Sequence, residues 1–130
     1  MRTDYLCRGQ YRTIPPGEPF WVYGQCTIQS DDLVTIATEE GVQVEVDSQT
    51  LGRCSGVRDD DGLLMYEGDI VSGLFLFEME VAGVVAFRDG SFGLRWMRGK
   101  SEEFTPFTSM CNVTYKIIGT IYDNNEEGIA

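Results

Sequence analysis

Apolar and polar positions alternate along most of the chain, and β-branched and aromatic residues fill many of the apolar positions. This period of two is typical of strands that bury one face, and turn residues separate the segments that carry it. The pattern predicts strands at residues 20–28, 33–38, 42–46, 69–77, 81–87, 91–97 and 115–122. Their spacing favours an antiparallel sheet.

Two connections between these segments are clearly marked by their turn residues. Glu39-Glu40-Gly41 lies between two short alternating segments, and Asp89-Gly90 lies between Val-Val-Ala-Phe-Arg and Ser-Phe-Gly-Leu-Arg-Trp. Asp-Gly suits the two-residue primed turn of a β-hairpin. We therefore predict a hairpin at Asp89-Gly90.

Alternation within this hairpin predicts which side chains are covered. Val85 and Phe87 share one side of the first strand, and Phe92, Leu94 and Trp96 share one side of the second. Burying five such side chains, at roughly 1.5–3 kcal/mol each, would anchor half of a small domain. The alternative is that the same residues form an exposed surface that recruits a partner.

Other segments lack a sustained period. Residues 97–111 contain Gly99 and Pro106 and predict a loop with one turn of helix, and residues 49–58 predict a connector. An edge strand is expected at residues 4–8, before the Pro-rich stretch. The last residues, 123–130, are polar and acidic and are expected to form a flexible tail.

These patterns predict a mainly β protein with at most one short helix. We expect antiparallel strands that form a small SH3-like barrel or a highly twisted sheet, with an additional N-terminal β layer. At 130 residues the chain has the length of one domain, which we place at residues 1–122. Residues 1–58 would hold the N-terminal strands and connector, and residues 59–122 the barrel-like part.

The net charge of −11 makes nucleic-acid binding an unfavoured function. Twenty-one acidic residues outnumber ten basic ones, whereas nucleic acids attract clustered Lys and Arg. Arg95, Arg98 and Lys100 lie close in sequence, and we interpret them as a solvated strand end. The acidity itself serves solubility, repels nucleic acid or imitates it.

The four cysteines, at positions 7, 26, 54 and 111, form no Cys-x-x-Cys pair, and the chain has no histidine. That spacing predicts no zinc site, and it indicates reduced, buried thiols that act as small hydrophobic side chains. Without histidine, the Ser-His and Cys-His nucleophile systems are excluded. No secretory signal and no apolar run of about twenty residues is visible, so we expect a cytoplasmic protein without a membrane span.

The segment Tyr66-Glu67-Gly68-Asp69 predicts a turn that ends where a strand begins. Gly68 supplies conformational freedom, the two acids supply short-range acceptors, and Ile70-Val71 favours extended backbone. The stretch has neither the several glycines nor the Lys of a phosphate-binding loop. It is therefore interpreted as an architectural corner.

Clustered carboxylates offer the remaining chemistry. Asp59-Asp60-Asp61-Gly62 does not fit the EF-hand register, so we expect a solvated turn there. Glu67 and Asp69 would share a face only in extended backbone, and the turn-cap role is the default. A metal-dependent hydrolase that uses Glu67, Asp69 and one acid of residues 59–61 is kept as an alternative. No catalytic, cofactor-binding or metal-binding residue is assigned.

Short motifs in a fixed order carry a resemblance to a known family. They are Tyr5-Leu6-Cys7-Arg8-Gly9, Phe20-Trp21-Val22-Tyr23-Gly24, residues 46–56, Asp60-Asp61-Gly62, Tyr66-Glu67-Gly68-Asp69-Ile70-Val71, Gly83-Val84-Val85, Asp89-Gly90-Ser91-Phe92-Gly93 and Ile118-Gly119-Thr120-Ile121-Tyr122. In this order they resemble the YopX family of phage and prophage proteins.

The resemblance implies a mostly β, cytosolic protein of a phage or an integrated element, which self-associates and has no agreed catalytic residues to transfer. The leading hypothesis is a non-enzymatic binding or self-assembling domain in the bacterial host cell. Besides the hydrolase, an acidic mimic of nucleic acid is the other alternative. The candidate functional or structural motif comprises Tyr66, Glu67, Gly68, Asp69, Asp89 and Gly90.

Overall fold

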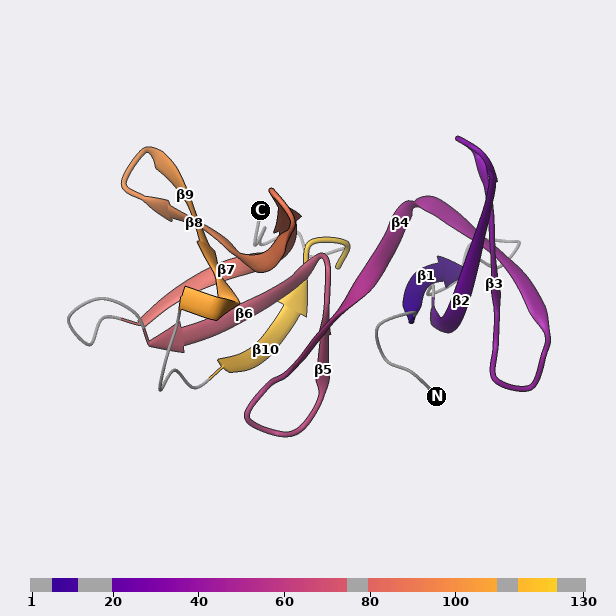
Figure 1. The fold of residues 1–130 in the computed structure, drawn as a ribbon, viewed down its shortest axis with the longest axis horizontal. Helices are drawn as coiled ribbons and strands as arrows, with labels where there is room; N and C mark the ends of the chain where they lie inside the picture. The colour runs from indigo at the N-terminus through magenta and orange to yellow at the C-terminus, as the bar shows by residue number, and fades with distance from the viewer. Residues whose placement is uncertain (1–5, 12–19, 75–79, 110–114, 124–130) are drawn as a thin grey trace. The chain divides into compact units, whose positions relative to one another are not determined.

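The computed structural model describes residues 6–11, 20–74, 80–109 and 115–123, which form two antiparallel sheets (Figure 1). The strands are β1 Cys7–Tyr11, β2 Phe20–Ser30, β3 Leu33–Ala37, β4 Gln43–Arg58, β5 Leu64–Tyr66, β6 Asp69–Leu74, β7 Glu80–Arg88, β8 Ser91–Arg98, β9 Ser101–Pro106 and β10 Tyr115–Thr120. A single 3-10 turn, η3, spans Phe107–Ser109 in this described part. The prediction of a mainly β, barrel-like fold with at most one short helix is confirmed.

The chain divides into two compact units, Met1–Cys54 and Ser55–Ala130, and β4 runs across the boundary. The predicted single domain, with parts at 1–58 and 59–122, stays a prediction. Residues 124–130 of the predicted tail lie outside the described residues. Among the residues that are described, no helical segment has the length and apolar character needed to cross a bilayer.

The first unit is a partly closed ring of four strands. β1 pairs with both β2 and β4, and β3 pairs with the same two strands. Val22, Val34, Ile36 and Val46 fill the ring as its buried core. The prediction of an edge strand at residues 4–8 is wrong for its described part, because β1 has a neighbour on each side.

The expected connector at residues 49–58 is instead the second half of β4. Here Arg8 pairs with Gly52 and Cys7 with Arg53, and the register shifts between Arg8 and Gln10. Backbone pairing does not require apolar side chains, so the Ser, Thr and Gly residues of this segment concealed the strand. Gly9 allows the close approach of β1 to the core, because a Cβ there would lie 2.6 Å from Val46 Cγ2.

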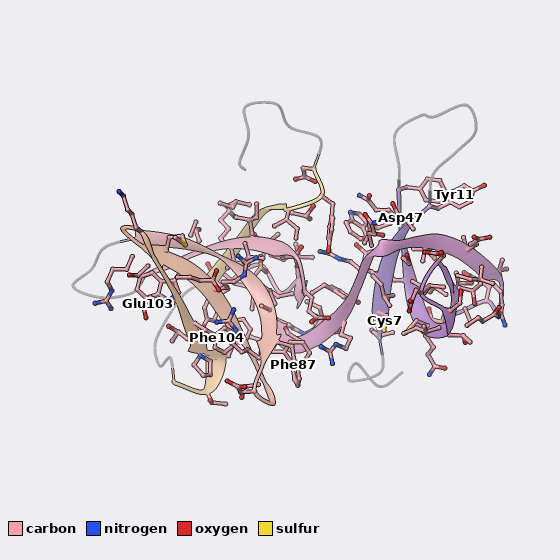
Figure 2. All side chains as sticks on the ribbon, turned by 90° about the horizontal axis from the view of Figure 1, so that it is seen from above. Cys7, Tyr11, Asp47, Phe87, Glu103 and Phe104 are labelled. Atoms are coloured by element: carbon pink, nitrogen blue, oxygen red, sulfur yellow. The ribbon has the colours of Figure 1, made fainter. Side chains whose placement is uncertain are left out.

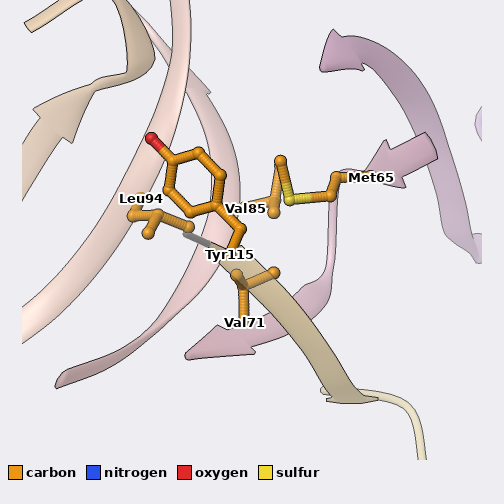
Figure 3. Close-up of a cluster of buried hydrophobic side chains, with 5 residues drawn as sticks. All are labelled: Met65, Val71, Val85, Leu94 and Tyr115. Carbon is orange, nitrogen blue, oxygen red and sulfur yellow. The ribbon is translucent and has the colours of Figure 1, made fainter. Parts of the chain in front are cut away.

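The second unit contains an open sheet with the order β10-β6-β7-β8-β9. One face of this sheet carries four buried side chains, Val71, Val85, Leu94 and Tyr115, and Met65 of β5 packs with them (Figure 3). Val57, Phe107 and Ile117 pack against this cluster. The alternation of the strands thus places the apolar positions on one face, as the sequence pattern requires.

The hairpin prediction at Asp89-Gly90 is confirmed. Arg88 pairs with Ser91, and Asp89 and Gly90 have φ angles of 53° and 85°. Positive φ at both central residues is the signature of a primed two-residue turn, which matches the twist of the flanking strands. Asp89 and Gly90 themselves are exposed at the tip of this hairpin.

The core predicted from the hairpin is correct only in part. Val85, Leu94 and Trp96 are buried, but Phe87 is 39% exposed and Phe92 is half-buried. Phe87 pairs with Phe92 directly beside the turn, and their ring centroids lie 4.8 Å apart. The aromatic pair therefore lies at the turn end of the hairpin, two residues beyond the buried Val85–Leu94 pair on the same face.

The expected loop at residues 97–111 is wrong for most of its length. β8 continues to Arg98, a second two-residue connection follows at Gly99-Lys100, and β9 occupies Ser101–Pro106. The expected turn of helix occurs as η3, and residues 110–111 lie outside the described residues. β9 pairs along β8 through its backbone, so its polar sequence gave no apolar period to detect.

Candidate functional site

Four of the candidate residues, Tyr66 to Asp69, form the corner between β5 and β6. Asp69 is only 2% exposed, and its Oδ2 accepts a hydrogen bond of 2.8 Å from the Tyr66 backbone N–H. This carboxylate caps the turn, which is the default role expected from the sequence. Asp89 and Gly90, the other two candidates, occupy a separate turn between β7 and β8.

Gly68 joins this corner to its neighbours. Its N–H donates to the Val85 carbonyl and its carbonyl accepts from the Ile121 N–H, each at 2.9 Å. Its φ is 94°, and a Cβ at this position would lie 2.8 Å from Cε2 of Tyr122. Both the conformation and the space therefore require glycine here. Tyr66, Gly68 and Asp69 are buried and Glu67 is half-buried, so the corner acts as a junction within the fold.

The acidic turn after β4 is organised by one buried carboxylate. Asp59 is 7% exposed, and its Oδ1 accepts from the N–H groups of Asp61 and Leu63 at 2.9 Å each. Its Oδ2 accepts from the Ile117 N–H at 3.2 Å, across to β10. The expectation of a solvated turn thus holds for Asp60 and Asp61, which are exposed, but is wrong for Asp59.

The same turn covers the outer edge of β10. The Asp60 N–H donates to the Tyr115 carbonyl at 2.8 Å, and Lys116 Nζ lies 3.0 Å from Asp61 Oδ2. The bond to the Tyr115 carbonyl and the bond from the Ile117 N–H occupy backbone positions that a further strand would otherwise use. One edge of the open sheet is therefore closed by the 59–62 turn.

Burial raises the pKa of the Asp59 carboxyl, but the backbone N–H groups of Leu63, Ile117 and Asp61 and the charge of Lys116 lower it by more. The net result is a pKa below the ordinary value of 3.8. Hydrogen bonds to the charged form have this effect because they are lost on protonation. Asp59 is thus held as a carboxylate that accepts hydrogen bonds from backbone N–H groups.

These bonds bear on the hydrolase alternative. Asp59 and Asp69 both direct carboxylate oxygens at backbone N–H groups, and Asp61 pairs with Lys116. Within the described ranges, no three His, Cys, Asp or Glu side chains gather closely enough to hold a metal ion. The geometry of these acids therefore fits turn capping and edge closure.

The opposite edge of the sheet is different. β9 has β8 as its neighbour, and no further strand of the described residues pairs with it. Arg98 and Ser101 close a two-residue hairpin, so the bonded pairs alternate from there along the two strands. By that alternation, the backbone groups of Glu102 and Phe104 face away from β8.

Side-chain contacts hold this open edge in place, and Figure 2 labels Glu103 and Phe104 of β9 and Phe87 of β7. Arg88 on β7 lies 2.8 Å from Glu102 Oε2, and its guanidinium carbon lies 5.2 Å from the centre of the Phe104 ring. The Phe104 ring covers Gly93, where a Cβ would lie 2.9 Å from its Cζ. The hydrogen bond from Arg88 also lowers the pKa of Glu102. The edge is thus ordered by contacts within its own sheet.

The predicted solvated basic residues lie on this same hairpin. Arg98 is exposed, with its guanidinium carbon 5.5 Å from the Trp96 ring and its Nε 4.0 Å from Glu103. Lys100 is exposed in the turn, and Arg95 is half-buried on β8. The acids Glu102 and Glu103 lie on the same hairpin, so the cations do not form a continuous basic strip.

Sequence reasoning missed a buried polar layer in the first unit. Arg8 is 4% exposed, with its guanidinium carbon 4.1 Å from the centre of the Trp21 ring. Gln10 is 5% exposed, and its N–H donates to Thr50 Oγ1 at 2.8 Å. The available signal was the spacing of Arg8 and Gln10, two residues apart in one strand, beside a neighbouring strand that begins with Phe-Trp. Their burial depends on ring closure through β4, which the sequence did not reveal.

A family model described as YopX protein matches residues 22–127 of the chain. Neither a curated protein nor a solved structure matches it.

Proposed function

Because the chain belongs to the YopX family, we propose that it is a non-enzymatic β domain that binds another protein chain during phage or prophage life. The site of action in this proposal is the cytoplasm of the bacterial host. The observation that carries it is the open edge of β9, with its outward-facing backbone at Glu102 and Phe104. The bound chain adds to the sheet as a further strand.

Strand addition follows from the chemistry of a sheet edge. An edge strand presents backbone N–H and C=O groups in the spacing that another extended chain can pair with. The backbone supplies affinity in such complexes, and side chains that flank the edge supply specificity. Here the flanking groups are the acids Glu102 and Glu103 and the half-buried ring of Phe104.

The acids also favour one class of partner. An in-register antiparallel copy would bring Glu102 and Glu103 of one chain close to those of the other, and like charges directly opposite are destabilising. A neutral or basic strand from a different protein avoids this cost. Binding of a second protein is therefore favoured over pairing with an identical edge.

The hydrolase alternative receives less support from the geometry. Its proposed ligands include Asp59 and Asp69, whose carboxylates already accept backbone N–H groups. Taking them for a metal ion would leave buried donors without acceptors, at roughly 1–3 kcal/mol each.

Two substitutions at one position test the proposal. Glu102→Pro removes an outward-facing N–H, whereas Glu102→Ala keeps that N–H and removes the same ion pair with Arg88. We expect the tagged Glu102→Ala protein to co-purify with the same partner as the wild type from induced or infected cells. The Glu102→Pro protein should lose that partner while remaining folded by circular dichroism.

Light scattering of the purified wild-type protein distinguishes a foreign partner from a copy. A monomer that captures a second protein through β9 agrees with the proposal as stated. Equal capture by the two Glu102 variants would show that β9 is not the binding edge.

A further inference from the structure

Two cysteines of the first unit lie in direct contact. The thiol of Cys7 on β1 donates to Sγ of Cys26 on β2, with the sulfur atoms 3.3 Å apart. Cys7 pairs with Gly24, so Cys26 lies two residues further along β2 and its side chain points to the same face. Adjacent strands thus deliver the two thiols to one place.

The two thiols differ in access to solvent. Cys7 is 6% exposed, whereas Cys26 is half-buried. Cys54 is the other cysteine of the described residues, at 3% exposure. It follows Arg53, the register partner of Cys7, so alternation turns its side chain to the opposite face of β4. Cys26 is the thiol of this pair that a dissolved reagent reaches first.

We propose that Cys7 and Cys26 are a redox-active dithiol that closes to a disulfide by exchange with oxidised glutathione or a similar small disulfide. The Cys26 thiolate attacks one sulfur of that disulfide, forming a mixed disulfide and releasing one small thiolate. The Cys7 thiolate then attacks Cys26 Sγ, forming the protein disulfide and releasing the second small thiolate. The protein loses two protons and two electrons, and the small disulfide becomes two thiols.

Closure would fasten β1 to β2 within the ring. The two cysteines are 19 positions apart, so the bond closes a loop of moderate length and restricts the unfolded chain. A loop of this size predicts a rise in the thermal midpoint of the first unit of roughly 12–25 °C on oxidation. The bond therefore acts as an oxidative lock on the ring.

The test is an incubation of the full chain in glutathione buffers of increasing oxidised fraction, followed by alkylation and peptide mapping by mass spectrometry. We expect a peptide that links Cys7 to Cys26 in the wild-type protein. Cys7→Ser should accumulate glutathione on Cys26, and Cys26→Ser should form neither product. Cys54→Ser is the matched control and should form the same linked peptide as the wild type.

Peptide mapping of the wild-type protein shows whether Cys7 and Cys26 form a disulfide even where a variant does not fold. A wild-type chain that stays reduced in fully oxidised glutathione would overturn the proposal. So would a cross-link that joins Cys54 or Cys111 in place of the proposed pair.

Discussion

The two units of this protein differ in how the edges of their sheets are paired. In the first unit, β1 pairs with both β2 and β4, so each strand of the four-stranded ring has two neighbours. In the second unit the sheet is open, and it ends at β10 on one side and β9 on the other. A closed ring leaves little backbone for another chain, whereas an open sheet must cover its edges or use them.

Within the open sheet, the two edges differ again. The 59–62 turn covers β10 through Asp59, Asp60 and Asp61. No comparable contact from the described residues covers the outer side of β9. A few well-placed backbone acceptors and donors are thus enough to cover one edge of the sheet, whereas β9 is left without such a cover by the described residues.

The largest expected effect is the loss of the β10 cover. Asp59→Ala removes the acceptor for three backbone N–H groups and should lower the free energy of unfolding of the second unit by about 4 kcal/mol. Urea unfolding followed by fluorescence measures it, and a Trp21→Phe background leaves Trp96 as the reporter of this unit. Asp60→Asn, at an exposed side chain, is the control and should change stability by less than about 0.5 kcal/mol.

Closure of the ring is tested next, at Gly9. An Ala Cβ would press on Val46, so Gly9→Ala should destabilise the first unit by about 3 kcal/mol. Trp96→Phe leaves Trp21 to report this unit. If the contact with Val46 causes this loss, Gly9→Ala should lower the free energy of unfolding much less in a Val46→Ala background than in the wild type. A double-mutant cycle measures that difference. Additive effects would mean that Gly9 matters for another reason.

Two glycines with similar backbone angles can be compared directly: Gly68 in the corner between β5 and β6, and Gly90 in the hairpin turn. Gly68 and Gly90 have φ angles of 94° and 85°, so Ala costs each a similar amount, roughly 1–2 kcal/mol. Only at Gly68 would the new Cβ also meet the Tyr122 ring. Urea unfolding should therefore show Gly68→Ala to be the more damaging substitution. Equal losses would remove the argument that this corner is a packed junction.

A smaller effect is expected from pH. The folded-state pKa of Asp59 lies below its unfolded value, so its contribution is fully present above the unfolded pKa, near 3.9, and is lost as pH falls through the folded pKa. The difference in stability between the wild type and Asp59→Asn should shrink below about pH 4. Urea midpoints measured from pH 7 down to pH 3 check this, and a constant difference would contradict the assigned role.

The sequence predicted those features that depend on local chemistry. The Asp89-Gly90 hairpin followed from turn residues, and the start of β6 at Asp69 followed from the corner before it. Residues 49–58 and β9 were missed because their pairing runs through the backbone of polar segments. Phe87 was misplaced because alternation gives the face of a side chain but not how far the cover of that face extends.

The open edge at β9 and the covered edge at β10 were less predictable from the sequence than the turns. An open edge is a property of strand order. The residues of Ser101–Pro106 do not indicate that β8 is the one neighbour of β9 among the described strands. In the sequence, Asp59 does not differ from any other acid of a solvated turn, because its burial depends on the contact with β10. Long-range pairing therefore decided both the covered edge and the open one.

Amide hydrogen exchange at Glu102 and Phe104 tests the role of β9 most directly. In the free protein these two amides should exchange much faster than those of Glu103 and Thr105, which face β8. In the complex with the co-purified partner, both should become protected. Amides that are already protected in the dilute free protein, or that still exchange fast in the complex, would contradict strand addition at this edge.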